Sequence, residues 1–150
     1  MNAEDKRNII QQMVDNGEFD YGATMPKVAL LASFGVEKTP DSDLANLSIP
    51  QVRKVIQREA LEEVDIITFV RKALMDLGRY LEVGGDTARV ALPSENKEFI
   101  RQYQDAAKRK LSMAQRLLQA TDPTHLGPQD NAAVRQLRQQ DSLKRQQRRH

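Results

Sequence analysis

The chain of 150 residues contains no cysteine, so it can form neither a disulfide nor a cysteine-ligated metal site. This composition fits a reducing compartment. No apolar run approaches the roughly 20 residues that span a bilayer. The first ten residues, MNAEDKRNII, are too polar and too acidic for a signal peptide. We therefore expect a cytoplasmic protein, or one carried within a virion, with no membrane partner.

Catalytic side chains are also scarce. The two histidines, His125 and His150, stand beside no plausible nucleophile and in no cluster of metal ligands. A hydrolytic triad and a histidine metal site are therefore poorly supported. Adjacent acids such as Glu62 and Glu63 splay apart on a helix, and solvated charge explains them better than acid–base catalysis does. The sequence predicts a protein that is not an enzyme and has no cofactor.

Charge is unevenly distributed behind a net charge of only +2. Residues 1–93 carry 11 Lys/Arg against 15 Asp/Glu, a net of −4, whereas residues 94–150 carry 12 against 6, a net of +6. A chain whose charge changes sign along its length often uses its basic part to bind an anionic partner. The simpler alternative is a solvated helix face.

Hydrophobic periodicity and helix-capping residues predict a mainly α-helical fold. We expect helices over residues 3–16, 24–34, 49–77 and 95–120, and a short helical piece within 42–47. The segment 49–77 is either one bent helix or two. Residues 1–120 are then the helical domain, 121–131 a Pro-containing linker and 132–150 a basic tail. The tail has too few apolar residues to bury, so alone it should be a frayed helix or disordered.

A short β-hairpin is predicted at residues 79–92, between two long helices. Tyr80 and Val83 belong to one extended run, Thr87 and Val90 belong to a second, and Gly84-Gly85-Asp86 can form the turn between them. The succession of helix, short hairpin and helix resembles the shape of winged-helix nucleic-acid binders. The resemblance is one of shape, and it implies that the hairpin would serve as the wing.

The long helix predicted at 95–120 carries an apolar stripe with nearly heptad spacing. The stripe consists of Ile100, Tyr103, Ala107, Ala114 and Leu117, is widened by Leu111 and Leu118, and is interrupted by Lys110. This pattern is compatible with a coiled coil, but it is short of the three or four clean heptads that would establish one.

Three groups of residues are candidates for binding nucleic acid. Each group combines side chains that read base edges or neutralise phosphates. They are Gln51, Lys54, Gln57 and Arg58 on the helix that follows Ser48; Arg79 and Arg89 at the hairpin; and Arg135, Arg138, Lys144, Arg145, Arg148 and Arg149 in the tail. An ordinary solvent-facing helix and a structural turn are the simpler explanations of the first two groups.

Two hypotheses follow from these patterns. The first is a non-enzymatic nucleic-acid-binding protein, with DNA favoured over RNA, that forms a homo-oligomer and holds phosphates with its basic C-terminal arm. The second is an oligomeric structural or assembly subunit, such as a phage virion or packaging component. In that case the basic tail would dock on an acidic surface of a protein neighbour.

Overall fold

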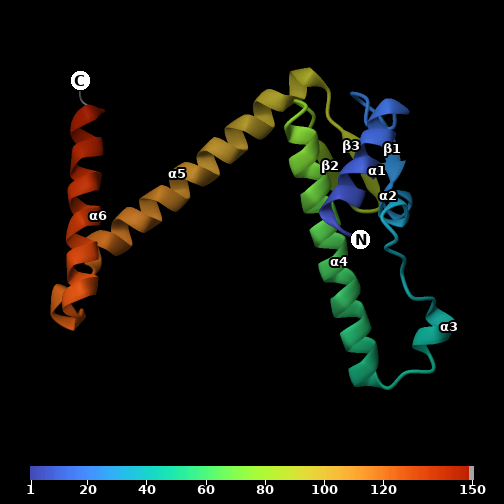
Figure 1. The fold of residues 1–150 in the computed structure, drawn as a ribbon, viewed down its shortest axis with the longest axis horizontal. Helices are drawn as coiled ribbons and strands as arrows, with labels where there is room; N and C mark the ends of the chain where they lie inside the picture. Colours follow the sequence, from blue (N-terminus) through green and yellow to red (C-terminus); the bar gives the residue numbers. More distant parts are fainter. Residues whose placement is uncertain (149–150) are drawn as a thin grey trace. The chain divides into compact units, whose positions relative to one another are not determined.

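The structure, a computed structural model, describes residues 1–148 and divides the chain into two units, Met1–Phe99 and Ile100–His150 (Figure 1). The fold is mainly α-helical with one small antiparallel sheet that includes the hairpin, as the sequence predicts. The N-terminal unit contains α1 (Ala3–Asp15), β1 (Thr24–Pro26), α2 (Lys27–Ser33), α3 (Asp41–Leu44), α4 (Ile49–Met75), β2 (Leu81–Gly84), β3 (Thr87–Val90) and the 3-10 turn η1 (Pro93–Glu95). The helix α5 (Asn96–Ala120) begins at the end of this unit, and η2 (Pro123–His125) and α6 (Pro128–Gln147) follow.

The strand β1 corrects the sequence prediction, which placed the first turn of a helix at Thr24. β1 pairs antiparallel with β3, with Thr24 opposite Arg89, so the strand order of the sheet is β1-β3-β2. Pro26 has no N–H to give to a ladder, which suits an edge strand, and its extended backbone precedes α2. Local pattern could not find β1, because its partner strand lies far along the chain.

The helix α4 is a single helix of 27 residues, which decides between the two alternatives for segment 49–77. At its start the Ser48 N–H donates to Gln51 Oε1 at 2.9 Å, half of a capping box. The buried side chains of α4 all lie in its second half: Ile66, Ile67, Val70 and Leu74. The first half of α4 therefore contributes an exposed surface rather than a core.

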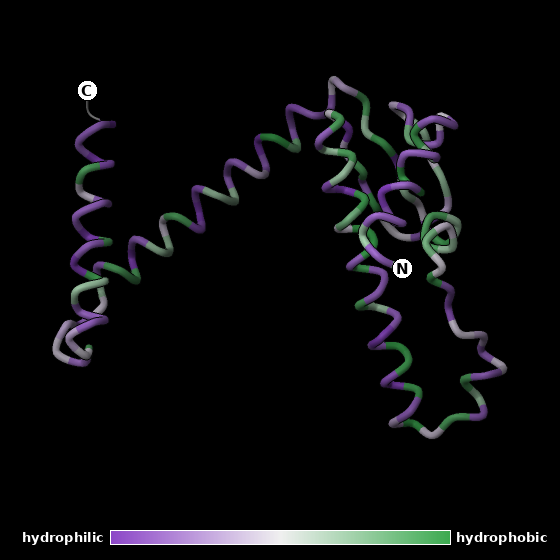
Figure 2. The backbone as a smooth tube through the Cα atoms, viewed as in Figure 1, coloured by the Kyte–Doolittle hydropathy of each residue, from purple (hydrophilic) through white to green (hydrophobic). Residues whose placement is uncertain are grey.

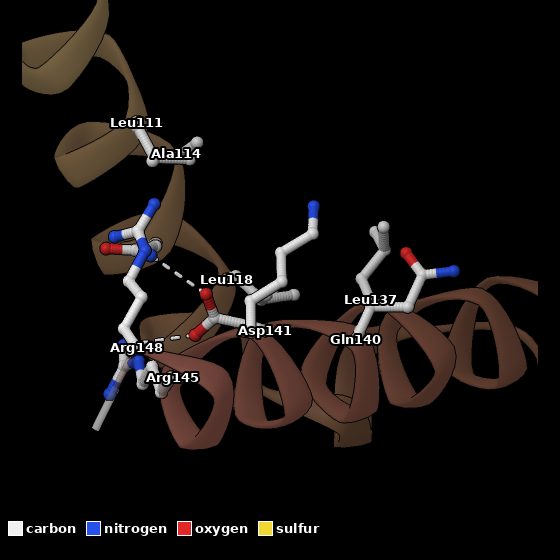
Figure 3. A pocket seen from close by; sticks show the side chains of 10 residues that line it. Leu111, Ala114, Leu118, Leu137, Gln140, Asp141, Arg145 and Arg148 are labelled. Atoms are coloured by element: carbon white, nitrogen blue, oxygen red, sulfur yellow. Dashed lines mark hydrogen bonds and ion pairs between the residues drawn. The ribbon is translucent and has the colours of Figure 1, made fainter. Parts of the chain in front are cut away.

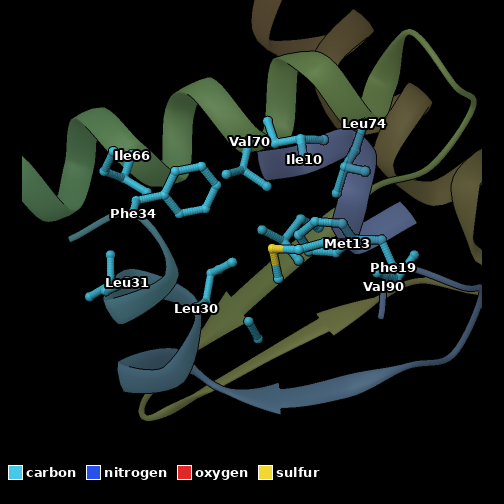
Figure 4. Close-up of a cluster of buried hydrophobic side chains, with 12 residues drawn as sticks. Ile10, Met13, Phe19, Leu30, Leu31, Phe34, Ile66, Val70, Leu74 and Val90 are labelled. Carbon is cyan, nitrogen blue, oxygen red and sulfur yellow. The ribbon is translucent and has the colours of Figure 1, made fainter. Parts of the chain in front are cut away.

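The core of the N-terminal unit lies between α4 and the sheet, and α1 and α2 complete it (Figure 4). It consists of Ile10, Met13, Phe19, Leu30, Leu31, Phe34, Ile66, Val70, Leu74, Leu81, Ala88 and Val90. Within residues 1–148 no polar or charged residue is buried. Burial of each large apolar side chain contributes about 1.5–3 kcal/mol, so this cluster is the main stabilising element of the unit.

The C-terminal unit is different, because neither α5 nor α6 contains a buried residue. Hydrophobic positions recur along α5 between hydrophilic ones (Figure 2). The segment that the sequence assigns to a linker and a separate tail forms η2 and α6, and α6 begins within the expected linker at Pro128. Arg149 and His150, which belong to the predicted tail, lie outside the described residues.

The substitution Leu74→Ala should lower the free energy of unfolding by about 2–5 kcal/mol, because it leaves a cavity at a fully buried position. The measurement is urea denaturation followed by circular dichroism. Leu77→Ala is the matched control: the same atoms are removed three residues later from a side chain that is 51% exposed. Its effect should be about 0.5 kcal/mol or less. Equal losses for the two variants would contradict the described core.

Candidate nucleic-acid interface

The first candidate surface is the exposed side of the first half of α4. Gln51, Lys54, Gln57 and Arg58 are all exposed there. Arg58 Nε lies 3.9 Å from Glu62 Oε1, one turn further along the helix. Residues four apart lie on one face of a helix, so this acid shares the face with the two cations. The surface therefore carries charges of both signs and attracts phosphate only weakly.

The segment that precedes α4 adds negative charge. The backbone N–H and the hydroxyl of Thr39 both donate to Glu59 Oε1, the former at 2.7 Å, and these two bonds lower the pKa of the Glu59 carboxyl. The short helix α3 carries Asp41 and Asp43 in its single turn. The sequence suggests that this short helix, a turn and α4 form a helix-turn-helix, and the acidic residues of α3 do not favour contact with phosphate there.

The hairpin arginine Arg89 is held by two carboxylates of its own unit. Its guanidinium lies 2.7 Å from Glu82 and 2.8 Å from Glu95. Arg89 lowers the pKa of Glu95, with a further contribution from the Leu92 N–H that donates to the same carboxyl. Arg89 therefore fixes β3 to β2 and to η1.

Arg79, the other candidate at the hairpin, is also engaged internally. Its Nη1 donates to the Phe19 carbonyl at 3.2 Å, and its guanidinium lies 5.6 Å from the ring centroid of Tyr21. The turn itself, Gly84-Gly85-Asp86, has no cationic side chain. The hairpin thus uses both arginines to hold its own unit together.

In the C-terminal unit, Arg138 joins α6 to the end of α5. Its guanidinium donates to the carbonyl of Leu118 at 3.1 Å and to that of Thr121 at 2.9 Å. Carbonyls at the last turn of a helix have no intrahelical partner, so a cation that donates to them is stabilising. Gln115 Nε2 donates to Asp141 Oδ1 at 2.8 Å, which adds a second connection (Figure 3).

The C-terminal hairpin is the name used here for α5 from Ile100 onward together with α6, which these contacts join near the end of α5. A pocket opens between its helices, with Leu111, Ala114, Leu118 and Leu137 among its apolar lining residues (Figure 3). Lys144, Arg145 and Arg148 add positive charge to its lining, and Arg145 lies 3.0 Å from Asp141. The pocket therefore combines an apolar surface with cations.

Most other cations of the C-terminal hairpin are available to a partner. Lys108, Arg109, Arg116 and Arg135 are exposed, and none of them forms an ion pair within residues 1–148. Arg135 and Arg138 thus differ in role although they lie three residues apart on α6. Arg138 and Asp141, which contact α5, are half-buried on α6, as is Val134. Only Val134 of the three is apolar, so hydrophobic periodicity did not single out this side of α6.

Comparisons with known proteins give no match: no family model, curated protein or solved structure is significantly similar to this chain. Among residues 1–148, no group of His, Asp and Glu side chains is arranged to hold a metal ion. No helix in that range has both the length and the apolar character needed to cross a bilayer.

Arg138→Gln should loosen the C-terminal hairpin, because it removes the charged donor that hydrogen-bonds to two carbonyls at the end of α5. Loss of these hydrogen bonds should destabilise the hairpin by about 1–3 kcal/mol in total. The expected result is faster amide hydrogen exchange in α6 and in the last turn of α5. Arg135→Gln is the matched control, since it removes the same charge from an exposed side chain. Equal exchange rates in the two variants would contradict the role assigned to Arg138.

Proposed function

We propose that this chain is a non-enzymatic nucleic-acid-binding protein whose C-terminal hairpin contacts phosphates. The observation that carries the proposal is the division of charge between the two units. Residues 100–150 carry 11 Lys/Arg and four Asp/Glu, a net of +7, whereas residues 1–99 carry 12 and 17, a net of −5. Cations that neutralise phosphates release condensed counterions, which supplies sequence-independent affinity.

The arrangement of cations on α5 supports this proposal. Arg101 and Lys108 lie seven residues apart, as do Arg109 and Arg116, so each pair recurs after two turns on nearly the same face. Lys108, Arg109 and Arg116 have no acidic partner within residues 1–148. Contact of these three cations with phosphate would therefore not require an internal ion pair to break first.

The N-terminal unit adds an analogy of topology alone, since its hairpin arginines are engaged internally and its α4 surface carries charges of both signs. Its elements follow one another as a helix, a strand, further helices and a final pair of strands, and the sheet order is β1-β3-β2. This topology resembles that of a winged-helix domain. In that analogy α4 would present Gln51, Lys54, Gln57 and Arg58 to base edges. A helix enters the major groove of DNA but not the narrow major groove of A-form RNA, so we favour duplex DNA.

The alternative is an assembly subunit whose C-terminal hairpin docks on an acidic protein surface. One observation favours it: Met113 and Leu117 are 67% and 72% exposed, and phosphates would not cover them. Exposed apolar groups beside cations are typical of protein interfaces. Both candidates place the partner on the C-terminal hairpin, and they differ in whether the cations face phosphate or protein.

The test is binding of the full-length protein to a random DNA duplex over a series of salt concentrations. We expect the logarithm of the affinity to fall linearly with the logarithm of salt. The combined substitutions Lys108→Gln, Arg116→Gln and Arg135→Gln should reduce the slope by up to about 2.7, since each lost phosphate contact contributes about 0.9. The matched control removes three positive charges from α4, by Arg53→Gln, Lys54→Gln and Arg58→Gln, and should change the slope less.

Two outcomes would contradict the proposed contact. If only the α4 substitutions reduced the slope, the N-terminal unit rather than the C-terminal hairpin would hold the phosphates. If the unaltered protein did not bind DNA even at low salt, the alternative of a protein partner would replace the proposal.

A further inference from the structure

The first half of α4 continues the apolar face that its second half buries. Ile49, Ile56 and Val70 are separated by multiples of two helical turns, so they lie on nearly the same side of α4. Val70 is fully buried, whereas Ile49 is 71% exposed and Ile56 is 54% exposed. The core therefore ends partway along α4, and the apolar face extends beyond it into the exposed first half.

A groove lies where this exposed face meets α2 and the segment 36–44, which contains α3. This segment leaves α2 and leads back toward the start of α4 (Figure 1). The buried side chain of Leu31 belongs to the lining of the groove, and Val28, Leu44 and Ile56 add further apolar surface. The groove has a volume of about 320 Å³, near the lower end of ligand pockets. It can therefore accept a few apolar side chains of a partner.

Polar contacts hold the walls of the groove together. Lys27 Nζ of α2 lies 2.7 Å from Glu63 Oε1 of α4, and the two side chains are only 15% and 25% exposed. The backbone N–H and the hydroxyl of Thr39 donate to Glu59, which joins the segment 36–44 to α4. Both other walls are thus fixed to α4 without a ligand, and a preformed groove lowers the entropic cost of binding.

The rim of the groove is acidic. Among residues 1–148, the charged side chains that line it are Glu37, Asp41, Glu59, Glu63 and a single cation, Lys38. Glu37 and Asp41 are exposed, and neither forms an ion pair within the described part of the chain. Such a rim repels phosphates and attracts a cationic partner, so charge complementarity indicates what the groove binds.

We propose that this groove binds a basic amphipathic helix of another protein. Its lining comes from helices and an irregular segment, and no strand within residues 1–148 contributes to it, so the partner cannot dock by adding a strand to a sheet. The aliphatic side chains of the partner helix lie against Leu44 and Ile56. Its lysines or arginines lie beside Glu37 and Asp41. This inference goes beyond the proposed function, because it uses the N-terminal unit and no nucleic acid.

The test adds three synthetic peptides of equal length to the full-length protein without nucleic acid. In the first peptide, leucine recurs every three or four residues and lysine occupies the other positions. The second has glutamate in place of lysine, and the third has alanine in place of leucine. Methyl NMR signals of Val28, Leu44 and Ile56 report the site, and fluorescence anisotropy of labelled peptide gives the affinity. The first peptide should shift all three signals and bind at least about tenfold more tightly than either of the others.

A first pair of variants tests the apolar part of the groove. Ile56→Ala should weaken binding of the lysine–leucine peptide about three- to tenfold, because less apolar surface is buried against the partner. Leu61→Ala is the matched control, since Leu61 is 61% exposed on the same helix and does not line the groove. It should leave the affinity unchanged. Both side chains are exposed, so both variants should keep the fold, which circular dichroism checks.

A second pair of variants tests the acidic rim. Glu37→Gln combined with Asp41→Asn should weaken binding of the same peptide about two- to thirtyfold and make the affinity less sensitive to salt. Glu18→Gln combined with Asp65→Asn removes the same two charges from exposed positions of the N-terminal unit that do not line the groove. This control should weaken binding less.

Three results would overturn the proposal. Equal binding of the lysine and glutamate peptides would show that the partner need not be basic. Shifts of the same three signals when the protein alone is concentrated would identify a second copy of the chain as the occupant. A lysine–leucine peptide that left the signals unchanged even at millimolar concentration would remove the groove as a docking site. None of these results would affect the DNA-binding proposal, which is measured separately.

Discussion

The N-terminal unit depends on the contact between the second half of α4 and the sheet. Ile66, Val70 and Leu74 recur on one face of α4, and the same cluster contains Leu81 of β2 and Val90 of β3. The chain can reverse directly after α4 because Gly78 adopts a φ of +71°, which favours glycine. This contact fixes the hairpin to the helix and leaves the first half of α4 exposed.

The two units are stabilised by different kinds of interaction. The N-terminal unit buries a cluster of apolar side chains, whereas the C-terminal hairpin buries none and is held by polar contacts such as those of Arg138 and Asp141. Helices gain most of their stability from packing of an apolar face, and neither α5 nor α6 has such a buried face.

Local pattern in the sequence was sufficient for much of the fold. Periodicity and caps identified α1, α4, the hairpin and α5, because these signals lie within a turn or two of each residue. Helical spacing also predicted that Lys54 and Arg58 are exposed opposite Ile49 and Ile56, but these two isoleucines are exposed as well, because the first half of α4 packs against no core. The strand β1 did not, because Thr24 is in a strand only through its pairing with β3. The contacts between α6 and the end of α5 were likewise missed, since a tail considered alone has too few apolar residues to be ordered.

The sequence by itself determined where apolar and charged residues recur and how charge divides between the two ends, since these properties require no partner. Only the tertiary structure decided which arginines are available. Arg89 is bound by Glu82 and Glu95, and Arg79 donates to the carbonyl of Phe19, whereas Arg135 is exposed without an acidic partner in residues 1–148. The physical reason is that a side chain's partner is set by distance in space, and folding brings together groups that are far apart along the chain.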